Sequence, residues 1–208
     1  MGCAPDLPLQ RLQAVLGALQ MCRADLEIDV RHVVTGEQLA DLRRACLDLG
    51  LIHATAAPGF VVERVYRGEA FAAVVGLAHR VALRESTTLA DLAGDVLLVV
   101  PRRAEPGIHD RIVALAASDC DGFREVREAP GADPRDLLFA VASGRGVTLA
   151  PRSTLRAVGE LGTAVAACSL AAPAAMPDTC LAWPADARDE LVRVYDAARE
   201  VARELRRP

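Results

Sequence analysis

The residues best suited to bind a small molecule follow strand-like segments or open helix-like ones. Thr35 opens a helical pattern, His53 ends a short apolar run, and Arg102 and Arg103 follow the apolar run 96–100. The amides of a first helical turn lack intrahelical acceptors, and the helix dipole favours negative charge there. An arginine can pair with a carboxylate through two parallel hydrogen bonds. The pattern therefore predicts a binding site that favours an anionic molecule.

A general rule widens this set. In sheets built from alternating strands and helices, ligands lie outside the carboxyl ends of the strands, near helix N-termini. The candidate ligand-binding residues are Pro5, Asp6, Thr35, Gln38, His53, Pro101, Arg102, Arg103, Gly107 and Glu128, with Ala4, His109 and Ala129 beside them.

Several of these candidates also fit an ordinary structural role. Thr35 and Gln38 match a capping box, in which the threonine is an N-cap worth about 1 kcal/mol and can still contact a ligand. Arg102 equally fits a solvated surface arginine, and His53 a core histidine bonded to backbone. Asp6 is more often a helix cap than a ligand contact, and its charge would repel an anion.

The sequence carries no recognisable catalytic set. It has no nucleophile elbow, no paired-histidine zinc motif and no P-loop. The glycines of 144–146 follow a helical pattern and precede a strand, which is the wrong order for a dinucleotide fingerprint. His109 and Asp110 are adjacent, but no nucleophile accompanies them. We therefore expect no enzymatic activity, no catalytic residue, no metal and no cofactor.

Composition restricts the partners and the compartment. The formal net charge is −4, and the sequence lacks the basic stripe with which proteins bind nucleic acid. Six cysteines occur without a C-x-x-C pair, as expected of buried thiols in a reducing cytoplasm. No apolar run is long enough to cross a bilayer, and no export signal opens the chain. These features predict a cytoplasmic protein with no direct contact with membrane or nucleic acid.

Helical and strand-like patterns alternate along the chain and must position the candidate residues. The sequence predicts helices that open at 6–8, 35–38, 106–107, 134 and 186, a one-turn helix in 88–94, and a short helix at 153–158. Strands are expected at 26–30, 51–54, 61–67, 70–76, 96–100, 124–128, 146–150, 165–169 and 181–183. Repeated β-α units predict an α/β fold with parallel sheets, in two series joined near Gly76.

Four segments carry a resemblance to a known family. The segment 88–94 is close to a recurring L-x-D-L-x-G motif, and 141–151 resembles V-x-x-G-x-G-V-x-x-x-P. The segments 35–39 and 48–52 resemble the threonine-led opening of the second helix and the D-L-G approach to the third strand. Together these segments resemble the effector-binding (substrate-binding) domain of LysR-type transcription regulators, and the resemblance covers nearly the whole chain.

The resemblance implies a periplasmic-binding-protein-like fold of type 2, with two Rossmann-like lobes and a cleft between them. Regulatory lobe I would comprise 1–75 plus 181–208, and regulatory lobe II 76–180, with a hinge at 72–76 and 179–184. Effector contacts would lie in the first loop, at Thr35 and after Pro101. The family's N-terminal winged helix-turn-helix is absent from this chain, so DNA binding would belong to a full-length parent. A homodimer or tetramer is also implied, and helices 36–48 and 109–118 are our expected contact surface.

Three functions remain to be compared. The first is an effector-sensing domain that binds a small molecule, for example a carboxylate, in the interlobe cleft to control transcription. The alternative is a solute-binding protein of a transport system, and the third is an enzyme that uses this fold. Peroxide-sensing relatives use two reactive cysteines in the second lobe, but Cys120 and Cys168 lack the expected spacing for such a switch.

Overall fold

The computed structural model describes residues 1–118, 122–186 and 189–206. The chain forms two compact units, Met1–Gly68 with Pro177–Pro208, and Glu69–Met176. It therefore passes from one unit to the other twice, once in each direction. The first passage precedes the predicted hinge segment 72–76, and the second precedes 179–184. In the described residues, none of the helices combines the length and apolar character that a membrane span requires.

Unit 1 is built around a five-stranded mixed sheet. Its strands run in the order β2-β1-β3-β11-β4, in which β2, β1 and β3 are parallel and β11 is antiparallel to both of its neighbours. The elements of unit 1 are β1 (Gly2–Cys3), α1 (Leu9–Cys22), β2 (Arg31–His32), α2 (Thr35–Arg43), β3 (Gly50–His53), β4 (Phe60–Tyr66), β11 (Thr179–Pro184), the 3-10 helix η3 (Asp189–Leu191) and α6 (Val192–Leu205).

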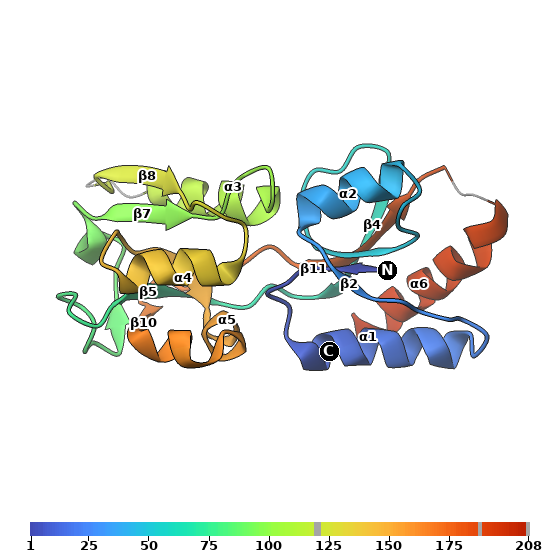
Figure 1. The fold of residues 1–208 in the computed structure, drawn as a ribbon, viewed down its shortest axis with the longest axis horizontal. Helices are drawn as coiled ribbons and strands as arrows, with labels where there is room; N and C mark the ends of the chain where they lie inside the picture. The colour runs from blue at the N-terminus through green and yellow to red at the C-terminus, as the bar shows by residue number, and fades with distance from the viewer. Residues whose placement is uncertain (119–121, 187–188, 207–208) are drawn as a thin grey trace. The chain divides into compact units, whose positions relative to one another are not determined.

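The two faces of this sheet carry separate apolar clusters, because alternate side chains of a strand point to opposite faces. On β11, Cys180 and Ala182 pack in the cluster that contains Leu39 and Leu42 of α2. Leu181 and Trp183 belong to the other cluster, with α1 and α6. Figure 1 shows α2 on one side of the unit 1 strands and α1 on the other. The alternation in β11 thus fixes which helices cover which face.

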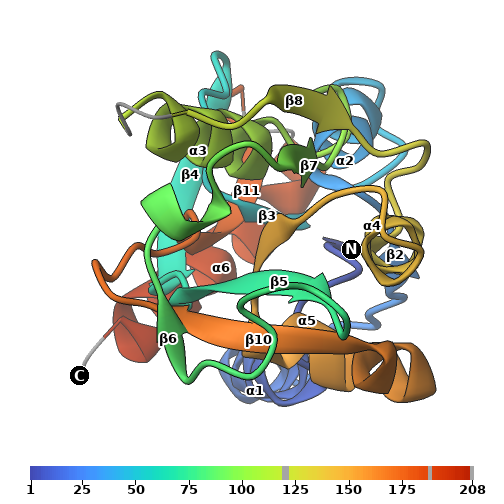
Figure 2. The same ribbon diagram turned by 90° about the vertical axis from the view of Figure 1, so that its left-hand side faces the viewer.

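Unit 2 contains a four-stranded sheet and a separate parallel pair. The sheet has the order β6-β10-β5-β9, and β5 is antiparallel to both β10 and β9. Figure 2 shows β5 and β10 side by side. The elements of unit 2 are β5 (Phe71–Gly76), β6 (Ser86–Thr87), the 3-10 helix η1 (Ala90–Leu92), β7 (Val96–Val99), α3 (Pro106–Ala117), β8 (Glu125–Glu128), α4 (Pro134–Ala142), β9 (Thr148–Pro151), α5 (Arg152–Ala157), the 3-10 helix η2 (Gly159–Ala164) and β10 (Val165–Leu170).

One apolar core joins the parts of unit 2. Strand β7 pairs in parallel with β8, and Leu97 also bridges Val147 just before β9. Leu97, Ile112 of α3 and Leu138 of α4 are all at least 99% buried in the same cluster. Helices α3 and α4 therefore pack on the strand whose carboxyl end leads to Pro101.

The sequence-based expectation of parallel sheets is wrong in part. Both larger sheets are mixed, because β11 returns to unit 1 antiparallel to β3, and β5 is antiparallel to its two neighbours. The run 26–30 forms no strand, although Ile28 and Val30 pack against the core; only Arg31–His32 pairs with β1. Leu9, the first residue of α1, is 61% exposed.

The helices α4 and α2 differ in how their first turns are capped. The Asp133 carboxylate accepts a hydrogen bond of 2.8 Å from the Arg135 amide and so caps α4, the helix that the sequence predicts to open at 134. The capping box expected at Thr35 is wrong. Thr35 is already the first helical residue, Val34 is the N-cap, and the Gln38 amide donates to the Val34 carbonyl.

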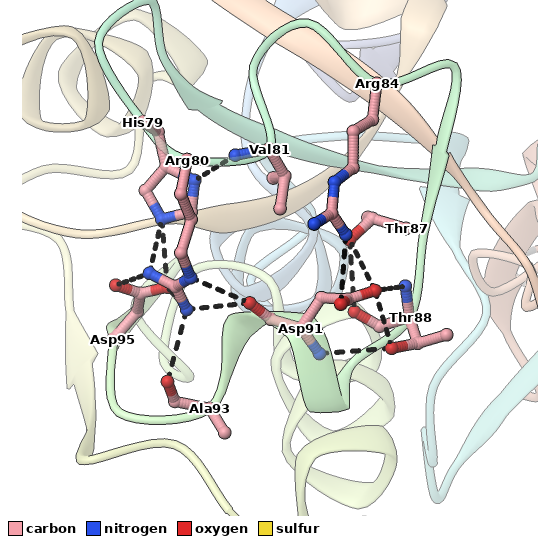
Figure 3. A network of polar contacts seen from close by, with 9 residues as sticks. All are labelled: His79, Arg80, Val81, Arg84, Thr87, Thr88, Asp91, Ala93 and Asp95. Atoms are coloured by element: carbon pink, nitrogen blue, oxygen red, sulfur yellow. Dashed lines mark hydrogen bonds and ion pairs between the residues drawn. The ribbon is translucent and has the colours of Figure 1, made fainter.

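The segment 88–94, which resembles the L-x-D-L-x-G motif, forms hydrogen bonds and ion pairs with the polar stretch that follows β5 (Figure 3). Asp91 accepts hydrogen bonds from the Thr88 amide and hydroxyl, both at 2.9 Å, and pairs with Arg84 at 3.0 Å. The backbone and side-chain hydrogen bonds from Thr88, together with Arg84, lower the pKa of Asp91 to about 2. Arg80 donates to the Asp91 and Ala93 carbonyls. The motif aspartate therefore has a structural role.

Candidate functional site

The unit 1 candidates gather at the carboxyl ends of two neighbouring parallel strands. The Ala4 amide, directly after β1, donates to the Leu51 carbonyl of β3, so the two strand ends meet. Asp6 follows β1, His53 is the last residue of β3, and His53 Nε2 lies 2.8 Å from Asp6 Oδ1. Their side chains are only 12% and 5% exposed. The sequence predicts both residues as candidate contacts but does not predict that they pair.

The first turn of α2 lies beside this pair. The Thr35 hydroxyl accepts a hydrogen bond of 3.2 Å from the His53 amide, and Thr35 is fully buried. Thr35 thereby ties the start of α2 to the end of β3. The amides of a first helical turn and the helix dipole favour an anion at this position.

Gln38 is fully buried beneath this turn. Its Nε2 donates to the Val33 carbonyl at 2.6 Å and to the Leu51 carbonyl at 3.2 Å. A Cβ atom at Gly2 would approach Gln38 Oε1 to 2.7 Å, and one at Gly50 to 2.9 Å, so both strands need glycine where the amide crosses them. These contacts give Gln38 a structural role, and a contact with the effector stays a prediction.

The charge balance of the Asp6–His53 pair favours the ionised carboxylate. Burial alone would raise the pKa of Asp6, but the charge and hydrogen bond of His53, with the residue's own backbone, outweigh it and lower the pKa. Burial, reinforced by Asp6, raises the pKa of the neighbouring Cys3 thiol to about 12. The pair therefore offers a carboxylate offset by an imidazole, beside a thiol that stays protonated.

The unit 2 candidates gather at the carboxyl ends of β7 and β8. Glu128 Oε1 accepts a hydrogen bond of 2.9 Å from the Arg102 amide. The Arg102 guanidinium makes two bonds to Asp110 of α3, at 2.6 and 2.9 Å. These bonds raise the pKa of Arg102 and lower that of Asp110. Arg102 is therefore already paired, which its sequence position did not reveal.

Arg103 is exposed and forms no ion pair with any residue in the described ranges. Pro101 is buried, and Gly107 is half-buried in the first turn of α3. His109 Nδ1 lies 2.9 Å from the Val100 carbonyl and 3.7 Å from Glu128 Oε1. Of the two arginines, Arg103 is thus the one left to receive a carboxylate.

Two buried side chains near these candidates were not predicted from the sequence. Glu105 is 4% exposed at the N-cap position of α3, and its place directly before Pro106 was the available signal. Cys3 is 1% exposed at the end of β1. Pro5 is half-buried between Cys3 and Asp6. Each unit thus has its own group of candidates, and the interlobe location of the effector stays a prediction.

The cysteines and possible metal ligands add no further site. Cys168 is fully buried, and its thiol donates to the Val81 carbonyl at 3.1 Å. Burial raises its pKa. Cys120 lies outside the described residues. Within the described ranges, no group of three or more histidine, cysteine, aspartate or glutamate side chains is placed to hold a metal ion.

Comparison with known proteins gives one family. Residues 1–203 match the family model described as LysR substrate binding domain. The uncharacterized HTH-type transcriptional regulator YnfL of Escherichia coli K12 is 27% identical over 148 residues, which is 70% of this chain and 49% of that protein. The chain therefore spans about half the length of this relative.

Solved structures agree on the fold at low sequence identity. The BenM effector binding domain with its effector benzoate is 19% identical with a TM-score of 0.69, covering 98% of this chain and 89% of that one. The reduced form of OxyR is 21% identical with a TM-score of 0.69, covering 98% and 93%. The LysR family regulator HinK from Pseudomonas aeruginosa is 16% identical with a TM-score of 0.70, covering 98% and 69%.

These likenesses confirm the predicted α/β fold of the periplasmic-binding-protein-like type. The matched proteins are transcription regulators and not enzymes. The family model spans almost the whole sequence, so this match, and not the distant structural likeness, establishes the family. The chain belongs to the LysR substrate-binding domain family, the ligand-sensing domain of LysR-type transcription regulators.

Proposed function

We propose that this domain senses a small carboxylate at the group formed by Asp6, Thr35 and His53. The observation that supports this is their convergence at the start of α2, where Thr35 Oγ1 lies 3.2 Å from the His53 amide and His53 lies 2.8 Å from Asp6. The dipole of α2 favours an anion, and His53 offsets the charge of Asp6. Arg103 is the second candidate contact, because its guanidinium has no ion-pair partner within the described ranges.

Benzoate is the first probe to test. It is named as the effector of the BenM domain that this chain resembles in fold. A bound molecule can regulate only if it has different affinities for two arrangements of the protein. We propose that the effector shifts this balance in a full-length, cytoplasmic homodimer or tetramer that contacts DNA through an N-terminal winged helix-turn-helix. Helices α2 and α3 are the proposed contact surfaces between copies.

Thermal unfolding with added carboxylates tests the proposed site. A ligand at 100 times its Kd stabilises the native state by about 2.7 kcal/mol, which raises Tm. We expect benzoate or another small carboxylate to raise Tm in the unmodified domain. Thr35→Ala removes the hydroxyl that fixes His53 and should weaken the affinity about tenfold. Thr163→Ala, which removes an exposed hydroxyl bonded to the Glu160 carbonyl in unit 2, is the matched control.

Two results would overturn the proposed site. One is a panel of small carboxylates that leaves Tm unchanged at millimolar concentration. The other is a Thr35→Ala domain that binds the active carboxylate as tightly as the Thr163→Ala domain does.

The regulatory role needs the full-length protein. We expect footprinting of the gene's own upstream DNA to show protection that changes when the active carboxylate is added. A full-length protein that protects no such DNA in either state would contradict this role. The alternative, a solute-binding protein of a transport system, is not favoured, because the matched family and the HTH-type relative are regulators. Recovery of the protein from a periplasmic fraction would restore that alternative.

A further inference from the structure

Unit 2 contains a pocket that is separate from the candidate residues around Arg102. Its volume is about 410 Å³, within the range of about 300–1,000 Å³ that is usual for small-molecule sites. Leu89 lines it after β6, Leu115 lines it from α3, and Leu170 lines it at the end of β10. The segment 172–174 closes one side. All of these residues belong to unit 2, so the pocket is complete within one compact unit.

Arg111 of α3 is the charged group in the pocket wall. Its Nε donates to the Ala175 carbonyl at 3.2 Å, which places the guanidinium near the segment 172–174. No carboxylate of the described residues lies within ion-pair distance of Arg111, whereas Arg80, Arg84, Arg102 and Arg127 of the same unit are each paired with one. The terminal nitrogens of Arg111 are therefore available for an anion.

Thr87 and Thr88 form another part of the pocket wall, and their hydroxyl groups already have acceptors. Both hydroxyls donate to Asp91 (Figure 3). Arg84, at 3.0 Å, offsets the charge of Asp91. This wall therefore presents fixed groups without a hydroxyl hydrogen left to donate, and Arg111 supplies the positive charge.

We propose that this pocket is a second ligand site, which takes a small molecule with an apolar body and one carboxylate. The carboxylate pairs with Arg111, and the apolar body lies against Leu89, Leu115 and Leu170. The orientation of the ligand follows from α3, which ends at Ala117. The negative end of the helix dipole disfavours an anion near Ser118, so the apolar body of the ligand lies there.

The site lies next to both chain passages between the units. Ala175, which Arg111 contacts, forms a β-bridge with Ala70, and the Phe71 amide donates to the Ala174 carbonyl at 2.8 Å. The units divide between Gly68 and Glu69 and between Met176 and Pro177. A carboxylate on Arg111 therefore acts on a side chain bonded to Ala175, which together with Ala70 lies where the chain leaves and enters unit 2, so occupancy of the pocket can modulate the response to the proposed effector.

Leucine-methyl NMR with hexanoate as the probe tests the proposal. We expect saturable shifts of the Leu89, Leu115 and Leu170 methyl signals. Arg111→Gln keeps a donor for the Ala175 carbonyl but removes the charge, and should weaken hexanoate binding about tenfold or more. Arg145→Gln, at an exposed arginine elsewhere in unit 2, makes the same change in net charge and should leave binding unchanged. Thr35→Ala should also leave it unchanged, which separates this pocket from the proposed effector site.

The uncharged analogue hexan-1-ol completes the design. It should bind the unmodified domain and the Arg111→Gln domain equally weakly. The proposal is overturned if the three leucine methyl signals do not shift, if Arg111→Gln binds hexanoate as the unmodified domain does, or if Arg145→Gln weakens binding equally. The unperturbed spectrum of each variant without ligand shows whether it is folded.

Discussion

At the scale of single residues, the buried pair of Asp6 and His53 links the proposed effector site to the stability of unit 1. A carboxylate whose pKa is lower in the folded than in the unfolded protein stabilises the fold above its ordinary pKa of about 4. This stabilisation is lost as pH falls towards the lowered value, because the unfolded chain takes up the proton first. The site therefore makes unit 1 sensitive to acid.

Asp6→Asn tests this link. Asparagine has nearly the same shape but no charge, so His53 loses its carboxylate partner, and we expect the free energy of unfolding to fall by about 2 kcal/mol at pH 7. The variant should also lose less stability between pH 5 and pH 3 than the unmodified domain. Urea unfolding at several pH values measures both effects.

Asp196→Asn is the matched control, since Asp196 is an exposed residue of α6 paired with Arg199 at 3.0 Å. Such surface pairs contribute about 1 kcal/mol or less. An Asp6→Asn domain with the same urea midpoint and the same acid sensitivity as this control would contradict the proposed link.

Individual residues also show why the sequence names candidates for the site but does not predict all of their contacts. Thr35 and Gln38 have the types and spacing of a capping box, but the hydroxyl is used by the His53 amide and the side-chain amide by two carbonyls. The sequence favours Arg102 as a carboxylate receptor, but its guanidinium is bonded to Asp110. These partners depend on which strand ends and helix starts meet in space, which local spacing does not encode.

At the scale of elements, α4 is held in unit 2 by the packing of one of its faces. Leu138 is fully buried and Phe139, the next residue, is 64% exposed. We expect Leu138→Ala to lower the free energy of unfolding of unit 2 by about 3 kcal/mol, because it removes apolar contacts and leaves a cavity. Phe139→Ala on the same helix should change it by about 0.5 kcal/mol or less. Urea unfolding of the two variants measures both changes, and equal losses of unfolding free energy would contradict this packing.

Most helices and strands were predictable from the sequence, because their apolar patterns and caps are local. The pairing of the strands was not. The strands β4 and β5 follow one another in sequence yet lie in different sheets, and β11 inserts between β3 and β4 from far along the chain. The run 26–30 alternates like a strand, but its neighbour β1 is only two residues long and pairs with Arg31–His32. Strand order is thus set by long-range packing.

At the scale of the whole molecule, the two compact units, each with its own buried apolar clusters, predict two unfolding transitions. Trp183, the single tryptophan, is 1% exposed in unit 1 and stacks on Tyr195 with ring centroids 5.9 Å apart. Its fluorescence therefore reports on unit 1, whereas far-ultraviolet circular dichroism reports on both units. We expect Leu138→Ala to lower the urea midpoint of the dichroism signal while the tryptophan midpoint moves much less.

Val201→Ala, at a fully buried position of α6, should instead move the tryptophan midpoint. If both variants moved both signals together by the same amount, the two units would unfold as one cooperative block.

Strand β11 also has a consequence for how the protein is made. A ribosome releases the chain from its N-terminus, so the contiguous stretch Glu69–Met176 is synthesised before β11 and can complete its own core first. The first sixty-eight residues cannot complete their sheet by then, because the strand between β3 and β4 lies beyond that stretch. The facing edges of β3 and β4 therefore stay unpaired until β11 emerges, and the sheet of unit 1 closes only after all of unit 2 has been made.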